Sequence, residues 1–249
     1  MFYFITFDKN YSMKKTLILL SVATIGAMTF TGCKKKGCTD STATNFNSKA
    51  KKDDASCVYT PTITIIGAAD TTVNVGSTYN DPGATAVNKD GSSVDVIVEQ
   101  LADSVNTGTT GVYYVNYKAT NTNGSATAKR KVNVIIGKDN WLQGWNVSSS
   151  CSSTSFPLAS NPTITEGPNA GTLLFDGMFN LFSGTVTATY SGATIAFTNQ
   201  IVTSIAGNIT FSGTGTMTPD GNLINVTFNY DNAIPFVGGP GSCVGTFSK

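Results

Sequence analysis

The side chains that most often perform acid–base chemistry are scarce in this 249-residue sequence, which contains no histidine. Without histidine, neither a Ser-His-Asp nor a Cys-His arrangement can be built. Paired carboxylates could still hydrolyse a glycosidic bond. The candidates by residue type are Glu99, Glu166, Asp176 and Asp231. None of them lies in the aromatic, glycine-lined context that is typical of a catalytic cleft, so we predict that the chain is not an enzyme.

Cys33 ends an N-terminal pattern that has a defined chemical outcome. Lys14 and Lys15 precede an apolar run, Thr16 to Phe30, that is too short to span a bilayer comfortably and leads into Thr31-Gly32-Cys33. This pattern resembles the signal peptide of bacterial lipoproteins, although leucine is usual in place of Phe30. The resemblance implies that residues 1–32 are removed, with Met13 as the better start, and that lipid on Cys33 anchors the mature chain to a membrane. An ordinary signal peptide or a core helix is the alternative.

The remaining four cysteines are an even number in a chain that we expect to be exported, which is the condition for disulfide bonds. Three pairings are open, and spacing favours the two that stay within their own segments, Cys38 with Cys57 and Cys151 with Cys243. A thiolate metal site is the rival interpretation. It is disfavoured because the sequence offers neither a C-x-x-C pair nor a histidine.

Residues 33–59 are polar and are predicted to form a disulfide-closed stalk. The runs Gly37–Asn47 and Asp53–Cys57 resemble a small cysteine-bounded module of secreted Bacteroidetes proteins. Its oxygen-bearing side chains are of the kind that calcium prefers, although they lack EF-hand spacing. The calcium candidates are Asp40, Asn45, Asn47, Asp53 and Asp54. The alternative is that these side chains form turns and caps and that the chain holds no cofactor.

Residues 60–137 alternate apolar and polar side chains with a period of two, for example in Thr62–Ile65 and Lys131–Val134, which predicts half-buried strands. The turn signals Asp81-Pro82-Gly83, Lys89-Asp90-Gly91 and Asn123-Gly124 recur at the spacing of a β-sandwich.

The same segment resembles the bacterial surface immunoglobulin-like domains of exported proteins and of some pesticidal crystal proteins. The residues that carry the resemblance are Val75–Ala86, Asp90-Gly91, Gly111–Asn121, Gly124–Thr127 and Arg130–Val134. It implies a spacer or adhesive module rather than an enzyme. Tyr113 stands where a tyrosine corner would tie one end of the sandwich.

Residues 138–249 again show strand patterns, with tight turns at Ser191-Gly192 and Asp220-Gly221 that predict an antiparallel meander. We expect a second β domain, either an open sandwich or a lipocalin-like barrel, in which a Cys151–Cys243 bond would bring the first strand to the last and join the two edges of the meander. Trp141 and Trp145 could form an exposed platform for stacking against a sugar, or they could be buried at the domain junction or the end of the core.

Charge is unevenly distributed along the chain. From Val58 onward, seven basic and eleven acidic residues give a net charge of −4, and such a body does not suit a nucleic-acid partner. Lys34, Lys35 and Lys36 follow the lipid site, where they could attract anionic headgroups.

We therefore predict an all-β, non-enzymatic lipoprotein of the outer membrane, at the cell surface or the periplasmic face. Its immunoglobulin-like spacer would present a β-rich domain that binds a glycan or protein ligand. The alternatives are a lipocalin-like carrier of a small apolar ligand, which needs a hollow interior, and a glycoside-hydrolase accessory protein.

Overall fold

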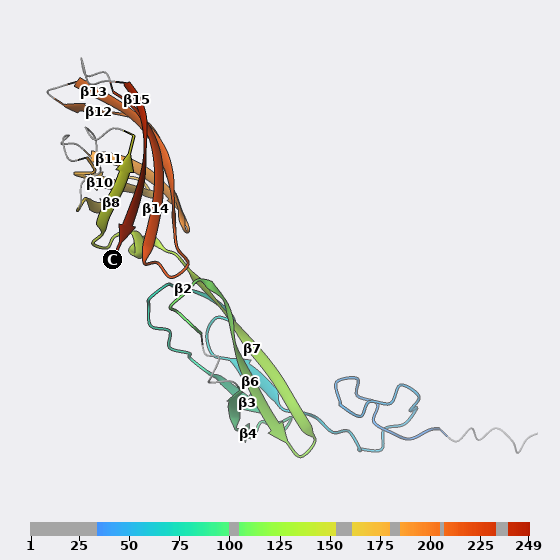
Figure 1. Ribbon diagram of the computed structural model, residues 1–249. Coiled ribbons are helices and arrows are strands. Elements are labelled where there is room, and N and C mark those ends of the chain that lie inside the picture. Colours follow the sequence, from blue (N-terminus) through green and yellow to red (C-terminus); the bar gives the residue numbers. More distant parts are fainter. Residues whose placement is uncertain (1–33, 100–104, 153–160, 180–184, 205–206, 233–238) are drawn as a thin grey trace, which may run out of the picture. The chain divides into compact units, whose positions relative to one another are not determined.

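The computed structural model describes residues 34–99, 105–152, 161–179, 185–204, 207–232 and 239–249 (Figure 1). Its residues divide into two compact units, with the boundary between Thr60 and Pro61, and each unit is described by itself. The predicted signal peptide and the predicted lipid site at Cys33 lie outside the described residues. Among the residues that are described, no helix has the length and apolar character needed to cross a membrane.

The first unit has little regular secondary structure and is ordered around a disulfide bond. Cys38, which is 1% exposed, is joined to Cys57, the pairing that the spacing favours. The side chain of Asn45 ties the same loop a second time, because its Nδ2 donates to Ser56 O (2.6 Å) and its Oδ1 accepts from Val58 N (3.0 Å). A covalent bond and side-chain hydrogen bonds thus take the place of the apolar core that this short polar segment cannot supply.

The second unit begins with two sheets that pack face to face, as the period-two pattern predicts. One sheet has the order β1 (Thr62–Ile65), β3 (Ala84–Val87) and β4 (Ser93–Val94). The other has the order β2 (Asp70–Asn74), β7 (Gly124–Ile135), β6 (Gly111–Asn121) and β5 (Val96–Glu99), in which only the β2–β7 pair is parallel. Tyr117, Ala119 and Val132 are at most 1% exposed and form part of the core.

A buried ion pair connects Arg130 on β7 to the Asp81-Pro82-Gly83 turn of this sandwich. Arg130, which is 1% exposed, donates from Nε to Asp81 Oδ1 at 2.8 Å. The same carboxylate accepts hydrogen bonds from Tyr117 Oη at 2.7 Å and from Tyr79 Oη at 3.0 Å. The carboxylate therefore neutralises a guanidinium that would otherwise be buried without a counter-charge.

The rest of the Arg130 guanidinium holds the chain segments that surround β1. Nη2 donates to the carbonyl oxygens of Ile66 (2.7 Å) and Gly83 (3.1 Å), and Nη1 donates to the carbonyl oxygen of Ala68. One side chain on β7 thus fixes the loop after β1 and the Asp81-Pro82-Gly83 turn together. The turn and Arg130 both belong to the residues that carry the immunoglobulin-like resemblance.

Tyr113 forms the predicted tyrosine corner. Its Oη donates to the carbonyl oxygen of Thr109, four residues upstream, at 3.2 Å. A Cβ atom on Gly111 would lie 3.1 Å from the ring of Tyr113, so glycine at this position lets the ring fold back over the backbone. The corner fixes the entry of the chain into β6.

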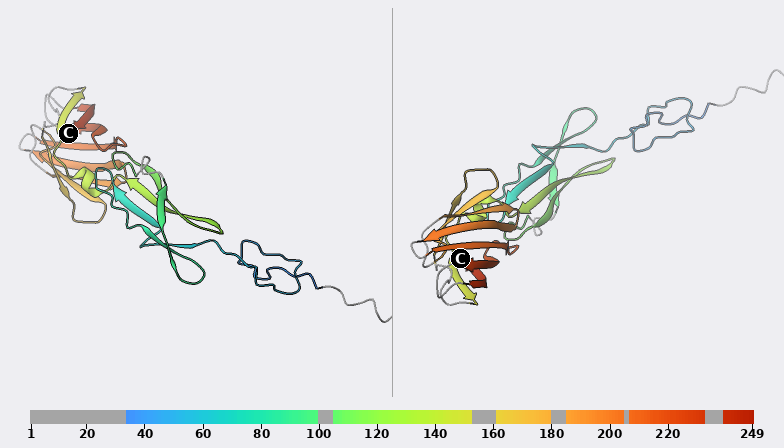
Figure 2. Two further views of the ribbon diagram at one scale, coloured as in Figure 1. Left: turned by 90° about the horizontal axis from the view of Figure 1, so that it is seen from below. Right: turned by 90° about the horizontal axis from the view of Figure 1, so that it is seen from above.

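A short helix, α2 (Lys138–Trp141), precedes a single antiparallel sheet of eight strands. The order of the sheet is β8 (Asn146–Cys151), β15 (Gly239–Ser248), β14 (Leu223–Asn232), β13 (Gly207–Met217), β12 (Thr194–Ser204), β11 (Thr185–Ser191), β10 (Thr172–Asp176) and β9 (Thr163–Glu166). The strands lie side by side and curl into a half-barrel (Figure 1, Figure 2).

The concave side of the half-barrel is filled by aromatic rings. Phe175 packs against Phe197 with ring centroids 5.2 Å apart, and Phe179 packs against Phe211 and Phe228 at 5.3 and 5.7 Å. All five side chains are at most 4% exposed. These rings belong to one continuous hydrophobic core of buried side chains.

The disulfide bond between Cys151 and Cys243 joins the first strand to the last, because the two residues are direct cross-strand partners on β8 and β15. The sequence argument expected this bond to join the two edges of the meander, and that expectation was wrong. β8 adds to the outer side of β15, so the edges become β8 and β9, and among the described strands these two do not pair. The half-barrel therefore has an open seam between β8 and β9.

Candidate functional site

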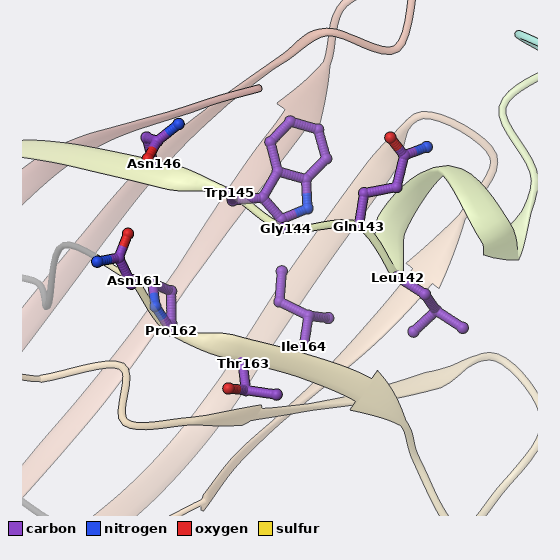
Figure 3. A pocket seen from close by; sticks show the side chains of 9 residues that line it. All are labelled: Leu142, Gln143, Gly144, Trp145, Asn146, Asn161, Pro162, Thr163 and Ile164. Carbon is purple, nitrogen blue, oxygen red and sulfur yellow. The ribbon is translucent and has the colours of Figure 1, made fainter.

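A groove of about 570 Å³ lies at one end of this seam (Figure 3). One wall is the segment that follows α2 and leads into β8, and the other is the start of β9. The lining residues are Leu142, Gln143, Gly144, Trp145, Asn146, Asn161, Pro162, Thr163 and Ile164. Its volume is within the range of about 300–1,000 Å³ that is usual for small-molecule sites.

The floor of the groove is apolar and fixed by the core. Trp145 is 3% exposed and Ile164 is 6% exposed. The indole Nε1 of Trp145 donates to the carbonyl oxygen of Trp141 at 3.1 Å, which holds the ring in place. Ile164 is the cross-strand partner of Phe175 and belongs to the same hydrophobic core. The floor is thus preformed and does not depend on a ligand to order it.

The rim of the groove is polar and uncharged. It carries three side-chain amides and one hydroxyl group, those of Gln143, Asn146, Asn161 and Thr163. Within the described residues, no hydrogen bond engages the side chains of Asn146 and Asn161, both of which are exposed. Amide groups both donate and accept hydrogen bonds, so the rim can meet hydroxyl or amide groups of a ligand from either side.

Charged side chains lie on the elements beside the groove, among them Asp176, which is the cross-strand partner of Thr163. Lys138 Nζ lies 2.9 Å from Glu166 Oε2, and this hydrogen bond raises the pKa of Lys138 above its ordinary value. Lys249 Nζ lies 5.9 Å from the centroid of the Trp145 ring, a cation–π contact. None of the nine lining residues is charged, so the lining itself forms no ion pair with an ionic ligand.

The carboxylates that were candidates for hydrolysis are not brought together. Glu99 forms an ion pair with Lys118, and Asp231 lies on β14. Asp176 is the cross-strand partner of Thr163 beside the groove, whereas Glu166 pairs with Leu173 at the other end of the β9–β10 hairpin. Neither this groove nor a second hollow on the sheet has an Asp or Glu in its lining, so neither holds the acid pair that glycoside hydrolysis needs.

Of the two alternatives for Trp141 and Trp145, burial in the core holds and the exposed platform does not. Trp141 is 0% exposed, donates from Nε1 to the carbonyl oxygen of Gly192 at 3.2 Å, and packs against Tyr190 at a centroid distance of 6.4 Å. Trp145 is 3% exposed and lines the groove. Burial of both rings in the core removes the flat surface that sugar stacking would use.

Four of the five calcium candidates of the stalk accept hydrogen bonds within local turns, and the fifth, Asn45, bridges the loop. Asp40 Oδ1 accepts from Thr42 N at 2.8 Å, and Asp54 Oδ1 accepts from Ser56 N at 3.2 Å. Asn47 and Asp53 cap turns in the same way, and Asn45 makes the cross-loop hydrogen bonds described above. No group of three or more Asp, Glu, Cys or His side chains placed to hold a metal ion occurs within the described part of the chain.

The groove residues were missed by sequence reasoning, which singled out only Trp145 among them. The two walls are separated by about fifteen positions in the sequence, and neither carries a motif. The one local signal is Asn161-Pro162, a turn-forming pair directly before the alternating run of β9. Only the pairing of β8 with β15 and of β9 with β10 leaves the two segments facing each other across the seam.

Comparisons with known proteins agree with the sandwich assignment. Residues 63–134 match the family described as bacterial surface protein, Ig-like domain. No curated protein matches the chain at a significant level.

Among solved structures, a lipoprotein from Bacteroides thetaiotaomicron is similar at 17% identity, covering 76% of this chain and 100% of that one, with a TM-score of 0.30. The CBM51-2 and INT domains of ZmpB from Clostridium perfringens, solved with GlcNAc, are similar at 14% identity over 76% of this chain and 43% of that one, with a TM-score of 0.25.

Proposed function

We propose that this chain, whose residues 63–134 form a bacterial surface Ig-like domain, is a non-enzymatic lipoprotein of the cell envelope that binds an uncharged saccharide in the seam groove. The lipid on Cys33 would anchor it to the outer membrane, and the stalk and the Ig-like sandwich would act as spacers. The half-barrel would carry the binding site.

The observation that carries this proposal is the chemistry of the groove lining. Side-chain amides and a hydroxyl group surround a buried apolar floor, and no lining side chain is charged. A sugar ring presents hydroxyl groups at its edge and C–H groups on its faces, so it satisfies rim and floor together. A lipid or an apolar carrier ligand that covered the rim would remove water from the amides without replacing its hydrogen bonds, which is unfavourable.

The test is a glycan array of the mature fragment, residues 34–249, followed by calorimetric titration of each saccharide that binds. We expect Asn161→Ala and Asn146→Ala each to weaken the affinity by about 2- to 12-fold, the equivalent of one hydrogen bond of about 0.5–1.5 kcal/mol. Thr127→Ala, at an exposed position of β7 in the sandwich, is the matched control and should leave the affinity unchanged. Binding of acidic saccharides only, or binding that ignores both asparagine substitutions, would refute the proposal.

The anchor is tested separately from the groove. Mass spectrometry of native protein should find acylated Cys33 at the N-terminus, and Cys33→Ala should move the protein out of the membrane fraction. Protease treatment of intact cells then assigns the face of the outer membrane, since only a surface-exposed chain is degraded. An unmodified N-terminus in native material would overturn the anchoring part of the proposal while leaving the groove untouched.

A further inference from the structure

The short first unit carries six exposed lysines, and its fold brings two separate runs of them together. Lys36 pairs with Lys52 in a parallel β-bridge. Beside this bridge, Lys51 N donates to the carbonyl oxygen of Lys35 at 2.8 Å, and Gly37 N donates to the carbonyl oxygen of Lys52 at 3.2 Å. We name the six residues the lysine patch: Lys34, Lys35, Lys36, Lys49, Lys51 and Lys52.

The pairing of the two runs places like charges side by side. Paired strands lie about 4.8 Å apart, and like charges that are direct partners on neighbouring strands destabilise the pair. The Cys38–Cys57 bond and the two hydrogen bonds of the Asn45 side chain close the same loop. This closed loop keeps the lysines together against their mutual repulsion, so a negatively charged partner that relieves the repulsion would be bound favourably.

The acidic residues of this unit do not neutralise the lysine patch. Residues 34–60 contain six lysines and three aspartates, which gives a net charge of +3. The aspartates accept hydrogen bonds from other groups, Asp53 and Asp54 from turn N–H groups and Asp40 from the hydroxyl of Tyr59 as well. No salt bridge in the described part of the chain involves a lysine of the patch.

The lysine patch begins directly after Cys33, the proposed lipid site. The three steps from Cys33 to Lys36 cover at most about 11 Å of extended chain, and the bridge adds only about 4.8 Å to reach Lys52. Electrostatic attraction extends about 8 Å in physiological salt, so the second run lies near enough to feel the same headgroups as the first. Residues 61–249 carry seven basic and eleven acidic residues, a net charge of −4, and an anionic surface would repel them.

We infer that the lysine patch is an electrostatic membrane contact that binds the phosphate headgroups of anionic phospholipids and holds the stalk against the membrane. The choice of a membrane rests on the proposed lipid anchor, whereas the charge and the pairing of the lysines do not. The acidic remainder of the chain disfavours a long soluble polyanion such as nucleic acid. Each lysine near an anionic surface strengthens binding by about fivefold.

The experiment is co-sedimentation of unlipidated residues 34–249 with vesicles of phosphatidylcholine alone and of an equimolar mixture with phosphatidylglycerol. Because this chain lacks Cys33, the result does not depend on acylation. The test variant is Lys51→Gln/Lys52→Gln, which removes part of the run that the fold adds. Its matched control is Lys89→Gln/Lys129→Gln, which removes the same charge from exposed positions of the Ig-like sandwich. Intact-mass measurement verifies that both disulfide bonds form.

We expect the parent to bind the anionic vesicles about 100-fold more strongly than the neutral ones, and this preference to disappear at about 1 M salt. The test variant should lose about 25-fold, the product of two lysines, and the control should change by less than about 2-fold. Asp53→Asn/Asp54→Asn keeps one acceptor oxygen at each turn and removes two negative charges, so it should strengthen binding.

Opening the loop with Cys38→Ser/Cys57→Ser should weaken binding at least about fivefold, because the two lysine runs then act as separate and weaker sites. Equal binding to both kinds of vesicle, an equal loss in the test variant and the control, or binding of soluble polyphosphate without binding of vesicles would overturn the inference. Acylated Cys33 in native protein together with no vesicle binding would overturn it and leave the proposed anchor intact. Vesicle binding with an unmodified N-terminus would overturn the anchor alone.

Discussion

Replacing Asp81 by asparagine should destabilise the Ig-like sandwich far more than an ordinary surface change. The Arg130 side chain is 2% exposed and the Asp81 side chain is 22% exposed. Removing one member of a buried ion pair costs about 3–5 kcal/mol, and we expect the lower end, about 3 kcal/mol, because water reaches one side of the carboxylate. An asparagine amide has one acceptor oxygen where the carboxylate has two, so it could not accept all the hydrogen bonds that Tyr79 and Tyr117 now donate to Asp81.

The matched control is Asp70→Asn, because Asp70 forms a 3.1 Å ion pair with Lys131 whose side chains are 60% and 40% exposed. Pairs that are this exposed contribute about 0–1 kcal/mol. Urea unfolding followed by far-UV circular dichroism measures both variants, and a loss of 3 kcal/mol corresponds to a midpoint shift of about 1–3 M for a slope of about 1–3 kcal/mol/M. If the free energies of unfolding of Asp81→Asn and Asp70→Asn differ by less than about 1 kcal/mol, the argument that Asp81 compensates a buried charge fails.

Three further predictions concern the tyrosines and the long disulfide bond. Tyr113→Phe should lower the free energy of unfolding by about 1 kcal/mol through loss of its hydrogen bond, whereas Tyr114→Phe, at a 44% exposed ring, should be neutral in the same urea assay. Burial, with Asp81 nearby, raises the pKa of Tyr79 and Tyr117. The stability that these two groups contribute is therefore fully present below the unfolded-state tyrosine pKa of about 10. It is lost as the pH rises above that value toward the raised pKa of the folded state. A pH series of urea titrations should show the free energy of unfolding falling above about pH 10, and Tyr79→Phe should make that fall less steep. A free energy of unfolding that stays constant up to about pH 11 would contradict this prediction. Cys151→Ser/Cys243→Ser should lower the free energy of unfolding by about 4–5 kcal/mol in the chain-entropy model, because the bond closes a loop with a sequence separation of 92. A change below about 1 kcal/mol, measured by tryptophan fluorescence, would show that the strand pairing of β8 does not depend on the bond.

Several elements could be predicted because their signals are local. The alternation in Thr62–Ile65 and Lys131–Val134 forms strands in the structure, and Ser191-Gly192 and Asp220-Gly221 form the turns of the meander. Both disulfide bonds join the pairs that spacing favours. Side-chain period and turn chemistry depend on neighbouring residues, so the sequence states them directly.

The candidate site could not be predicted in the same way. Trp141 and Trp145 suggested a binding platform by their residue type, yet their rings became part of the core. The groove walls carry no motif and depend on how β8 and β9 lie relative to each other, whereas the cysteine spacing indicated only that β8 lies beside β15. Strand order and the position of a sheet edge result from long-range pairing, in which many registers satisfy the same local pattern.

The sequence by itself thus determined an all-β chain with an Ig-like segment and a charge-poor C-terminal half, because composition and short-range periodicity encode those properties, and its cysteine spacing favoured the two pairs that are bonded. Tertiary structure alone decided that Arg130 would meet Asp81 and that the half-barrel would stay open between β8 and β9. Each of these outcomes requires residues that are distant in the chain to be brought into register, and the free energy that selects the register comes from the packed core as a whole.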